Sequence, residues 1–217
     1  IKGPGATFIT TLPPTGWESF TPLNVGTGGV FLLRNDTNYL IAGQSITQSL
    51  RLRGGRKVVV MGLTATISRS DWTTVGSSVT CGVMLDENPS SAPADGGPPL
   101  ADRAFHCEGM LFQGSSLTQG VLMSCPTADV TLVNNHCKKI AFDSCDHRDG
   151  TNGKTLNHPD LIQPDGGVKS ITIDGFTGYS AYQGLFLKED VNPQGGPVFL
   201  RRVDIHGVSH VGSAGVT

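Results

Sequence analysis

The chain has 217 residues and a mass of 22.8 kDa, which suits one domain with a sizeable core. Glycine accounts for 29 residues, only 16% of residues are charged, and the net charge is −2, a composition typical of a turn-rich, all-β protein. The sequence holds neither a long basic run nor about 18 consecutive apolar residues, so we expect no nucleic-acid partner and no membrane span.

Short strands are predicted along most of the chain. No stretch of a dozen residues keeps helical periodicity, because Gly or Pro interrupts it. Short apolar or β-branched runs recur instead, each closed by Gly, Pro, Asn or Asp. In chain order they cover residues 49–52, 57–62, 63–68, 79–85, 109–112, 120–123, 130–133, 170–173, 184–187, 197–200 and 203–208.

The spacing of these strands is close to periodic. Strand starts near Val121, Ile140 and Leu161 lie 19 and 21 residues apart. Those near Val130 and Ile171 lie 41 residues apart, which we interpret as two turns of about 20. A period of about 20 to 25 residues with short strands and no helix is typical of a β-solenoid, in which each coil stacks its strands on the next.

Two segments do not fit the coil pattern. Residues 1–37, with the turn-rich motifs GPG, LPPTGW and GTGG, are expected to be an N-terminal cap, since a bare solenoid end exposes core and an unpaired strand edge. The solenoid itself is then expected over residues 38–217. The Pro-rich stretch 86–103 is expected to be a surface loop thrown out from one coil.

The chain start and the cysteines give weaker indications. The first residue is Ile1 rather than Met and no signal-peptide pattern follows, so we expect a processed form or a piece of a longer protein. The five cysteines show no spacing typical of zinc sites, and we interpret them as buried free thiols, with one disulfide as the alternative.

Three segments resemble the pectate-lyase-like right-handed parallel β-helices. They are LRLRGGRKVVVMGLTATI (50–67), HPDLIQPDGGVKSITIDGFTG (158–178) and YQGLFLKEDVNPQGGPVFLRRVDIHGV (182–208). The resemblance implies a single-stranded right-handed parallel β-helix. That superfamily contains polysaccharide lyases, glycoside hydrolases, phage tailspikes and bacterial surface proteins, so the resemblance implies a polysaccharide or glycan partner and an extracellular, cell-surface or virion location. By family analogy a homotrimer is an option.

Polar motifs on successive predicted coils fall at the same general phase. Parallel stacking places residues one period apart about 4.8 Å from each other. The motifs CDHRDG (145–150), NHPD (157–160), QPD (163–165) and LKED (187–190) are therefore expected to meet in one lateral strip. We expect this strip to be the functional site.

A polysaccharide lyase is one activity that suits this strip. A lyase needs a base, plus a positive charge or Ca²⁺ that stabilises a carbanion-like state. Lys188, His158 and Arg148 could supply the base and the positive charge. The candidate calcium ligands are Asp146, Asp149 and Asp165.

A glycoside hydrolase is the second activity that suits the strip. It needs two carboxylates, and we pair Asp160 with Glu189 or Asp190. The NHPD motif loosely resembles the NTD motif of polygalacturonase-type hydrolases, with Asp160 at the matching carboxylate. The rest of that family's pattern, an Asp-Asp pair, Gly-His-Gly and Arg-Ile-Lys, is missing, which puts the activity in doubt.

Sugar contacts are expected beside the catalytic candidates. An exposed Tyr next to an amide is a common platform for stacking on sugar rings, which favours Tyr182 with Gln183. The other candidate ligand-binding residues are Arg148, Gln163 and Asp190.

Purely structural interpretations stand beside the functional ones. Coil turns are rich in Asp, Asn and Gly because these residues accept positive φ or cap backbone N–H groups. Asp165 with its two following glycines is therefore also interpreted as a turn, and Asn134–Asn135 as a turn or an Asn ladder. Arg201–Arg202 is interpreted as a solvated face, with a clamp on an acidic sugar as the alternative.

Three functions follow from the sequence. The first hypothesis is a glycan-recognising β-helix module of a phage tailspike or bacterial surface protein, because no complete catalytic motif is present. The alternatives are a polysaccharide lyase or glycoside hydrolase that acts on acidic glycans, and a structural spacer.

Overall fold

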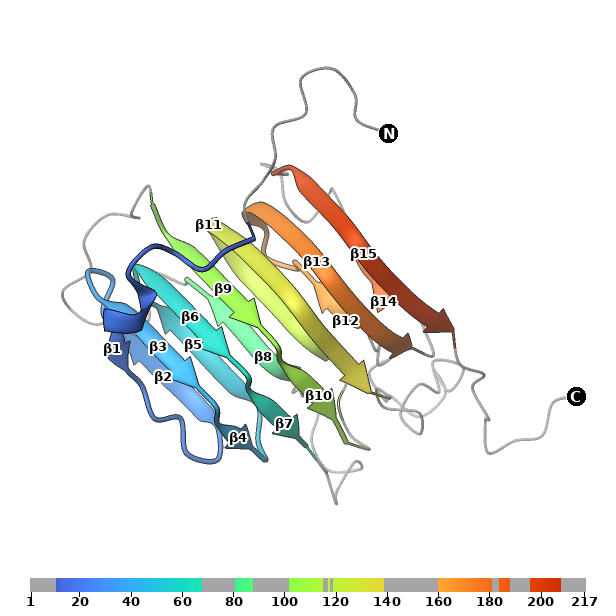
Figure 1. Ribbon diagram of the computed structural model, residues 1–217, viewed down its shortest axis with the longest axis horizontal. Coiled ribbons are helices and arrows are strands. Elements are labelled where there is room, and N and C mark those ends of the chain that lie inside the picture. The colour runs from blue at the N-terminus through green and yellow to red at the C-terminus, as the bar shows by residue number, and fades with distance from the viewer. Residues whose placement is uncertain are drawn as a thin grey trace, which may run out of the picture.

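The computed structural model describes residues 11–67, 81–87, 102–114, 117, 119–138, 160–180, 184–187 and 196–207. These residues form an all-β fold in which every strand pairing is parallel, which confirms the all-β, parallel part of the prediction. The parallel sheet curls into a half-barrel, and its strands follow one another in chain order from one end to the other (Figure 1). A single 3-10 turn, η1 (Trp17–Ser19), precedes the strands of this part of the chain.

The strands fall into three ladders according to their partners. The first ladder contains β2 (Gly29–Leu33), β5 (Leu50–Gly54), β8 (Cys81–Asp86), the start of β11 (Gln119–Lys138), β12 (Asp160–Gln163) and β14 (Gly184–Leu185). The second contains β1 (Thr21–Pro22), β3 (Asn38–Ala42), β6 (Lys57–Met61), β9 (Ala104–Glu108), the middle of β11, β13 (Val168–Ser180) and β15 (Val198–Gly207). The third contains β4 (Ser45–Ile46), β7 (Thr64–Thr66), β10 (Leu111–Gln113) and the last parts of β11, β13 and β15.

Most of the predicted strands coincide with observed ones, within a few residues. The sequence did not indicate β1, β2, β3, β4 or β9, and it indicated β12 only as a strand start near Leu161. The expected N-terminal cap, residues 1–37, contains β1 and β2, and β2 pairs in register with β5. Of the expected Pro-rich loop, residues 88–101 lie outside the described residues.

The interpretation of the 41-residue spacing was wrong. Val130 pairs directly with Ile171, so these 41 residues make one step of the ladder rather than two. Val121 likewise pairs with Ile162, so no other strand of this ladder lies between them, and Ile140 lies outside the described residues. The reason is physical: a segment inserted where the chain passes from one ladder to the next lengthens the sequence without changing the register of the strands.

The core lies between the ladders. Leu50 and Leu52 on β5 are fully buried and alternate with the partly exposed Arg51 and Arg53, as expected for a strand with one face on the core. The largest fully buried side chains include Phe105, Phe112 and Phe176.

Four of the cysteines are buried free thiols, as predicted: Cys81, Cys107, Cys125 and Cys137. Burial raises the pKa of the Cys81 and Cys107 thiols to about 12. They therefore remain protonated and unreactive at neutral pH. Cys145 lies outside the described residues.

A sharp corner separates the second ladder from the third. Asn134, Gly175 and Arg202 occupy this corner in β11, β13 and β15, and all three have positive φ, at 50°, 72° and 53°. Asn135 is buried and its Nδ2 donates to the carbonyl of Cys107 on the neighbouring strand β9, 3.0 Å away. The Asn pair therefore lies at this corner within β11, where the side chain of Asn135 joins two neighbouring strands.

A buried ion pair holds the corner between the first and second ladders. Arg103 donates from Nη1 to Glu87 Oε2 at 2.8 Å, from Nη2 to Asn35 Oδ1 at 2.7 Å and from Nε to the Gly55 carbonyl at 3.0 Å. The hydroxyl of Thr127 donates to the same Glu87 carboxylate. Arg103 thus links Asn35, Gly55 and Glu87, and it ties together the two ends of the Pro-rich loop.

Candidate functional site

The structure describes three of the residues that the sequence places in the site: Asp160, Gln163 and Asp165. The others lie outside the described residues: Asp146, Arg148, Asp149, His158, Tyr182, Gln183, Lys188, Glu189 and Asp190. Their arrangement in one strip therefore stays a prediction.

The described residues form a polar group on β11, β12 and the turn that follows β12, which we call the Asp160 cluster: Gln119, Asp160, Gln163 and Asp165. Asp160 opens β12 and lies opposite Gln119 of β11 in the ladder. Leu161 and Ile162 follow it into the core, as predicted, and both are fully buried. The cluster is therefore anchored by the strand that it begins.

Burial leaves two oxygens of the cluster without a hydrogen-bond donor. Asp160 is 1% exposed and Gln119 is 6% exposed. Asp160 Oδ1 and Gln119 Oε1 have no hydrogen-bond partner in the described part of the chain. Loss of hydration raises the pKa of Asp160 from 3.8 to about 7, because the charged carboxylate is the form that suffers most from burial. A proton kept on Asp160 would supply the missing donor.

The hydrogen bonds of the cluster run from the buried Gln119 towards the surface. Gln119 Nε2 donates to Gln163 Oε1, and Gln163 Nε2 makes a long contact of 3.5 Å with Asp165 Oδ1. Asp165 is exposed and lies in a turn that the Gly167 N–H closes on the Pro164 carbonyl at 3.2 Å. Asp165 is thus a turn residue, as its structural interpretation predicted.

The described residues do not assemble a metal site. No group of three or more His, Cys, Asp or Glu side chains among them could hold a metal ion. In the Asp160 cluster, Gln163 rather than a second carboxylate stands between Asp160 and Asp165. The two other predicted calcium ligands, Asp146 and Asp149, lie outside the described residues.

A second polar region, which the sequence did not indicate, lies on the third ladder. We call it the third-ladder strip: Gln113, His136, Lys138, Tyr179, Asp204 and His206. Phe112 and Cys137 pack in the core, so the residues next to them, at alternate positions, lie on the opposite face of the strands. The strip crosses the last parts of β10, β11, β13 and β15, which are adjacent in the ladder.

Aromatic rings form the centre of this strip. Tyr179 and His206 are paired in register and their rings stack, with centroids 4.8 Å apart and planes 16° from parallel. His136 meets Tyr179 edge to face, with centroids 6.3 Å apart. His206 Nε2 lies 3.1 Å from Asp204 Oδ2, which orients the imidazole. About half of the His206 side chain is exposed.

The remaining buried acids are paired with arginines. Asp174 is almost fully buried and accepts hydrogen bonds from Arg201 and Arg202, which lower its pKa to about 2. Both arginines are more than half exposed, as predicted for a solvated face, and they also stabilise the buried carboxylate of Asp174. Asp86 is held in the same way by arginines of the neighbouring strand, Arg51 at 2.6 Å and Arg53 at 3.1 Å.

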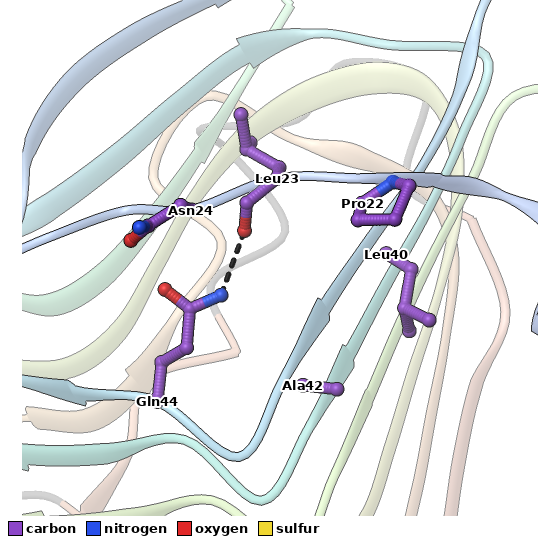
Figure 2. A pocket seen from close by; sticks show the side chains of 6 residues that line it. All are labelled: Pro22, Leu23, Asn24, Leu40, Ala42 and Gln44. Carbon is purple, nitrogen blue, oxygen red and sulfur yellow. Dashed lines mark hydrogen bonds between the residues drawn. The ribbon is translucent and has the colours of Figure 1, made fainter.

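A shallow groove lies beside β1 and β3, away from both polar regions. It has a volume of about 340 Å³ and is lined by Pro22, Leu23, Asn24, Leu40, Ala42 and Gln44. Figure 2 shows that the Gln44 amide points to the Leu23 carbonyl, to which its Nε2 donates at 2.7 Å. The polar groups of Gln44 are used by the backbone, since its Oε1 also accepts from the Val25 N–H. The groove has no titratable side chain among its lining residues.

The chain matches no protein-family model, no curated protein and no solved structure. None of the helices in the described segments is long and apolar enough to cross a membrane. The two polar regions are therefore the features of the molecule that bear on its function.

Proposed function

We propose that the three ladders form a right-handed parallel β-helix and that this β-helix is a glycan-recognising module. The chain enters the first, second and third ladders in turn before it returns to the first, which supports the β-helix. Connections between parallel strands of one sheet are right-handed in about 98% of cases. A location outside the cell or on a virion belongs to the same proposal.

The third-ladder strip carries the proposal. Glycans are bound by planar polar side chains that reach several hydroxyl groups, together with aromatic rings that pack against the sugar. The strip offers amide, imidazole, phenol and carboxylate groups on neighbouring strands, at the spacing of about 4.8 Å that the ladder imposes. A linear array of this kind suits an extended polymer better than a small ligand.

The experiment is a binding measurement on neutral and uronate-containing oligosaccharides by calorimetry. We expect Tyr179→Ala and His206→Ala each to weaken binding about tenfold, equivalent to about 1.4 kcal/mol. Lys169→Ala is the matched control, because Lys169 lies on the same strand as Tyr179 but on the second ladder, paired with Asp129. Equal losses in all three variants, or no binding to any oligosaccharide, would overturn the proposal.

A polysaccharide lyase or hydrolase is the second candidate, and the state of Asp160 favours it. A general acid must keep its proton near the working pH, and Asp160 has a pKa of about 7. Within the described residues, however, this carboxyl is enclosed, and no second carboxylate contacts it. The enzyme proposal therefore depends on its predicted partners Glu189 and Asp190.

A depolymerisation screen separates the two functions. Uronate-rich and neutral polysaccharides are incubated with the protein, with and without Ca²⁺, and both unsaturated ends and new reducing ends are measured. Turnover that Asp160→Asn abolishes supports the enzyme. Binding without turnover supports the module alone.

A further inference from the structure

Exposed apolar side chains gather at the two ends of the strand stack. Five of the six large hydrophobic residues that are exposed in the described part of the chain lie on β2 or β15: Val30, Leu32, Val198, Phe199 and Leu200. β2 is the first strand of its ladder and β15 is the last of its own. The middle of the stack shows no comparable apolar exposure in the described residues.

The edge at β15 is long and open. This strand covers ten residues without a proline, and β13 is its one strand partner among the described residues. Val198, Phe199 and Leu200 are 44%, 40% and 50% exposed. An exposed apolar edge strand is a template for pairing with another strand.

The opposite end of the same ladder offers a complementary shape. Its edge strand is β1, which has only two residues, Thr21 and Pro22, and both are exposed. Because β1 is so short, the end of β3 is left uncovered, and the groove of Figure 2 opens beside it. Pro22, Leu40 and Ala42 make much of the groove wall apolar.

The register of the second ladder connects the two ends. The residues paired in succession with Phe199, back along the stack, are Thr172, Thr131, His106, Val59, Leu40 and Pro22. A second chain that continues this ladder in register therefore brings its own Pro22 next to Phe199. The phenyl ring then faces the groove wall of that chain, and Val198 meets Thr21 by the same register.

We propose that a second copy of this chain docks head to tail, with β15 of one copy against β1 and the groove of the next. A second copy fits because it carries the matching register and the apolar groove together. Pro22 has no N–H to donate, so the contact relies on side-chain packing of Phe199 against the groove wall. The two surfaces are different, so the contact is heterologous. A pair of docked copies therefore still has one free β15 surface at one end and one free groove at the other. Association is therefore open-ended rather than closed.

Sedimentation velocity over a wide concentration range tests this proposal without any glycan. We expect the mean mass of the wild-type protein to rise with concentration without reaching a plateau. Phe199→Lys blocks the β15 surface and Ala42→Lys blocks the groove, and both positions are exposed, so we expect each variant to fold and to be monomeric alone. Circular dichroism checks the folding.

Mixing the two variants gives the decisive result. Each retains the surface that the other lacks, so an equimolar mixture is expected to form a dimer and to stop there. Leu12→Lys is the matched control, because Leu12 is an exposed hydrophobic residue outside both surfaces, and it is expected to associate like the wild type. A wild-type protein that stays monomeric, a mixture that fails to dimerise, or a closed trimer that all variants retain would overturn the proposal.

Discussion

The Asp160 cluster and the third-ladder strip are both polar, and both are built largely from β11 and its following strands, but they differ in access. The cluster buries its acid at 1% exposure, whereas about half of His206 in the strip is open to solvent. A polymer can reach the strip directly. It can reach Asp160 only if neighbouring residues move. A polar motif in the sequence identifies residues that could bind or react. The register of the strands decides which of these residues are exposed to solvent.

Buried acids differ among themselves for a related reason. Asp160 and Asp174 belong to successive strands and are both about 1% exposed, yet the pKa of the first is raised to about 7 and that of the second is lowered to about 2. Asp174 accepts hydrogen bonds from two guanidinium groups. Asp160 has an amide neighbour and an unpaired oxygen in the described residues. The presence of a cation, rather than burial, separates the two.

The largest effect is expected where the cation of a buried acid is removed. Arg103→Met leaves Glu87 buried without its ion pair and should lower the free energy of unfolding by about 3 to 5 kcal/mol, measured by urea denaturation. The matched control is Arg56→Met, because Arg56 pairs with Asp102 on the surface, where both side chains are nearly half exposed. The control should change stability little. Equal losses in the two variants would show that burial of the pair is unimportant.

Asp160→Asn should remove a pH dependence of stability. In the folded protein Asp160 keeps its proton up to a pH of about 7, whereas in the unfolded chain it loses the proton near its ordinary pKa of 3.8. The folded state therefore binds more protons between these values, and stability falls as pH rises from about 4 to 7. Asn cannot ionise, so the variant lacks this dependence on pH.

Denaturation at pH 4 and pH 8 measures this change. The free energy of unfolding of the variant minus that of the wild type should be higher at pH 8 than at pH 4 by more than about 1.4 kcal/mol, the equivalent of one pKa unit. Parallel pH profiles for the two proteins would mean that Asp160 is ionised in the folded state, and the cluster would then resemble Asp174.

Asp174→Asn should change the pH dependence of stability at lower pH and over a narrower range than Asp160→Asn. The paired carboxylate has a pKa of about 2 in the folded protein and 3.8 in the unfolded chain, so its stabilisation is present above pH 4 and is lost as pH falls towards 2. Because both arginines are largely exposed, solvent screens the pair and the effect is modest. Thermal unfolding between pH 2 and pH 5 should show a flatter acid limb in the variant. A change confined to pH 5 to 7 would contradict this assignment.

Strands with a clear apolar alternation could be predicted from the sequence, and the others could not. In β5 and β6, leucines and valines fill the core positions, which gives an unmistakable pattern. In β9 the polar residues His106 and Glu108 interrupt that pattern, although His106 is buried by the fold. β12 begins inside a polar motif at Asp160 and has only four residues, so the sequence indicated only a strand start near Leu161. Such strands are defined by their neighbours in the ladder.

The candidate site could be predicted only in part. Asp160 stood out in the sequence because Pro159 and two apolar residues flank it. Its burial depends on Gln119, which lies 41 residues earlier and becomes a neighbour only through the register. The third-ladder strip combines side chains from β10, β11, β13 and β15, and no local motif contains more than two of them. Only the observed register brings these residues together.

The most direct test of the glycan-recognition proposal is an NMR titration of the ¹⁵N-labelled protein with the oligosaccharides of the binding panel. The account predicts chemical-shift changes that centre on the amides of the third-ladder strip, above all Tyr179 and His206, and leave the amides of Gln119 and Asp160 unmoved. Shifts that centre on Asp160, Gln163 and Asp165 instead would contradict it and would show that the glycan binds at the Asp160 cluster.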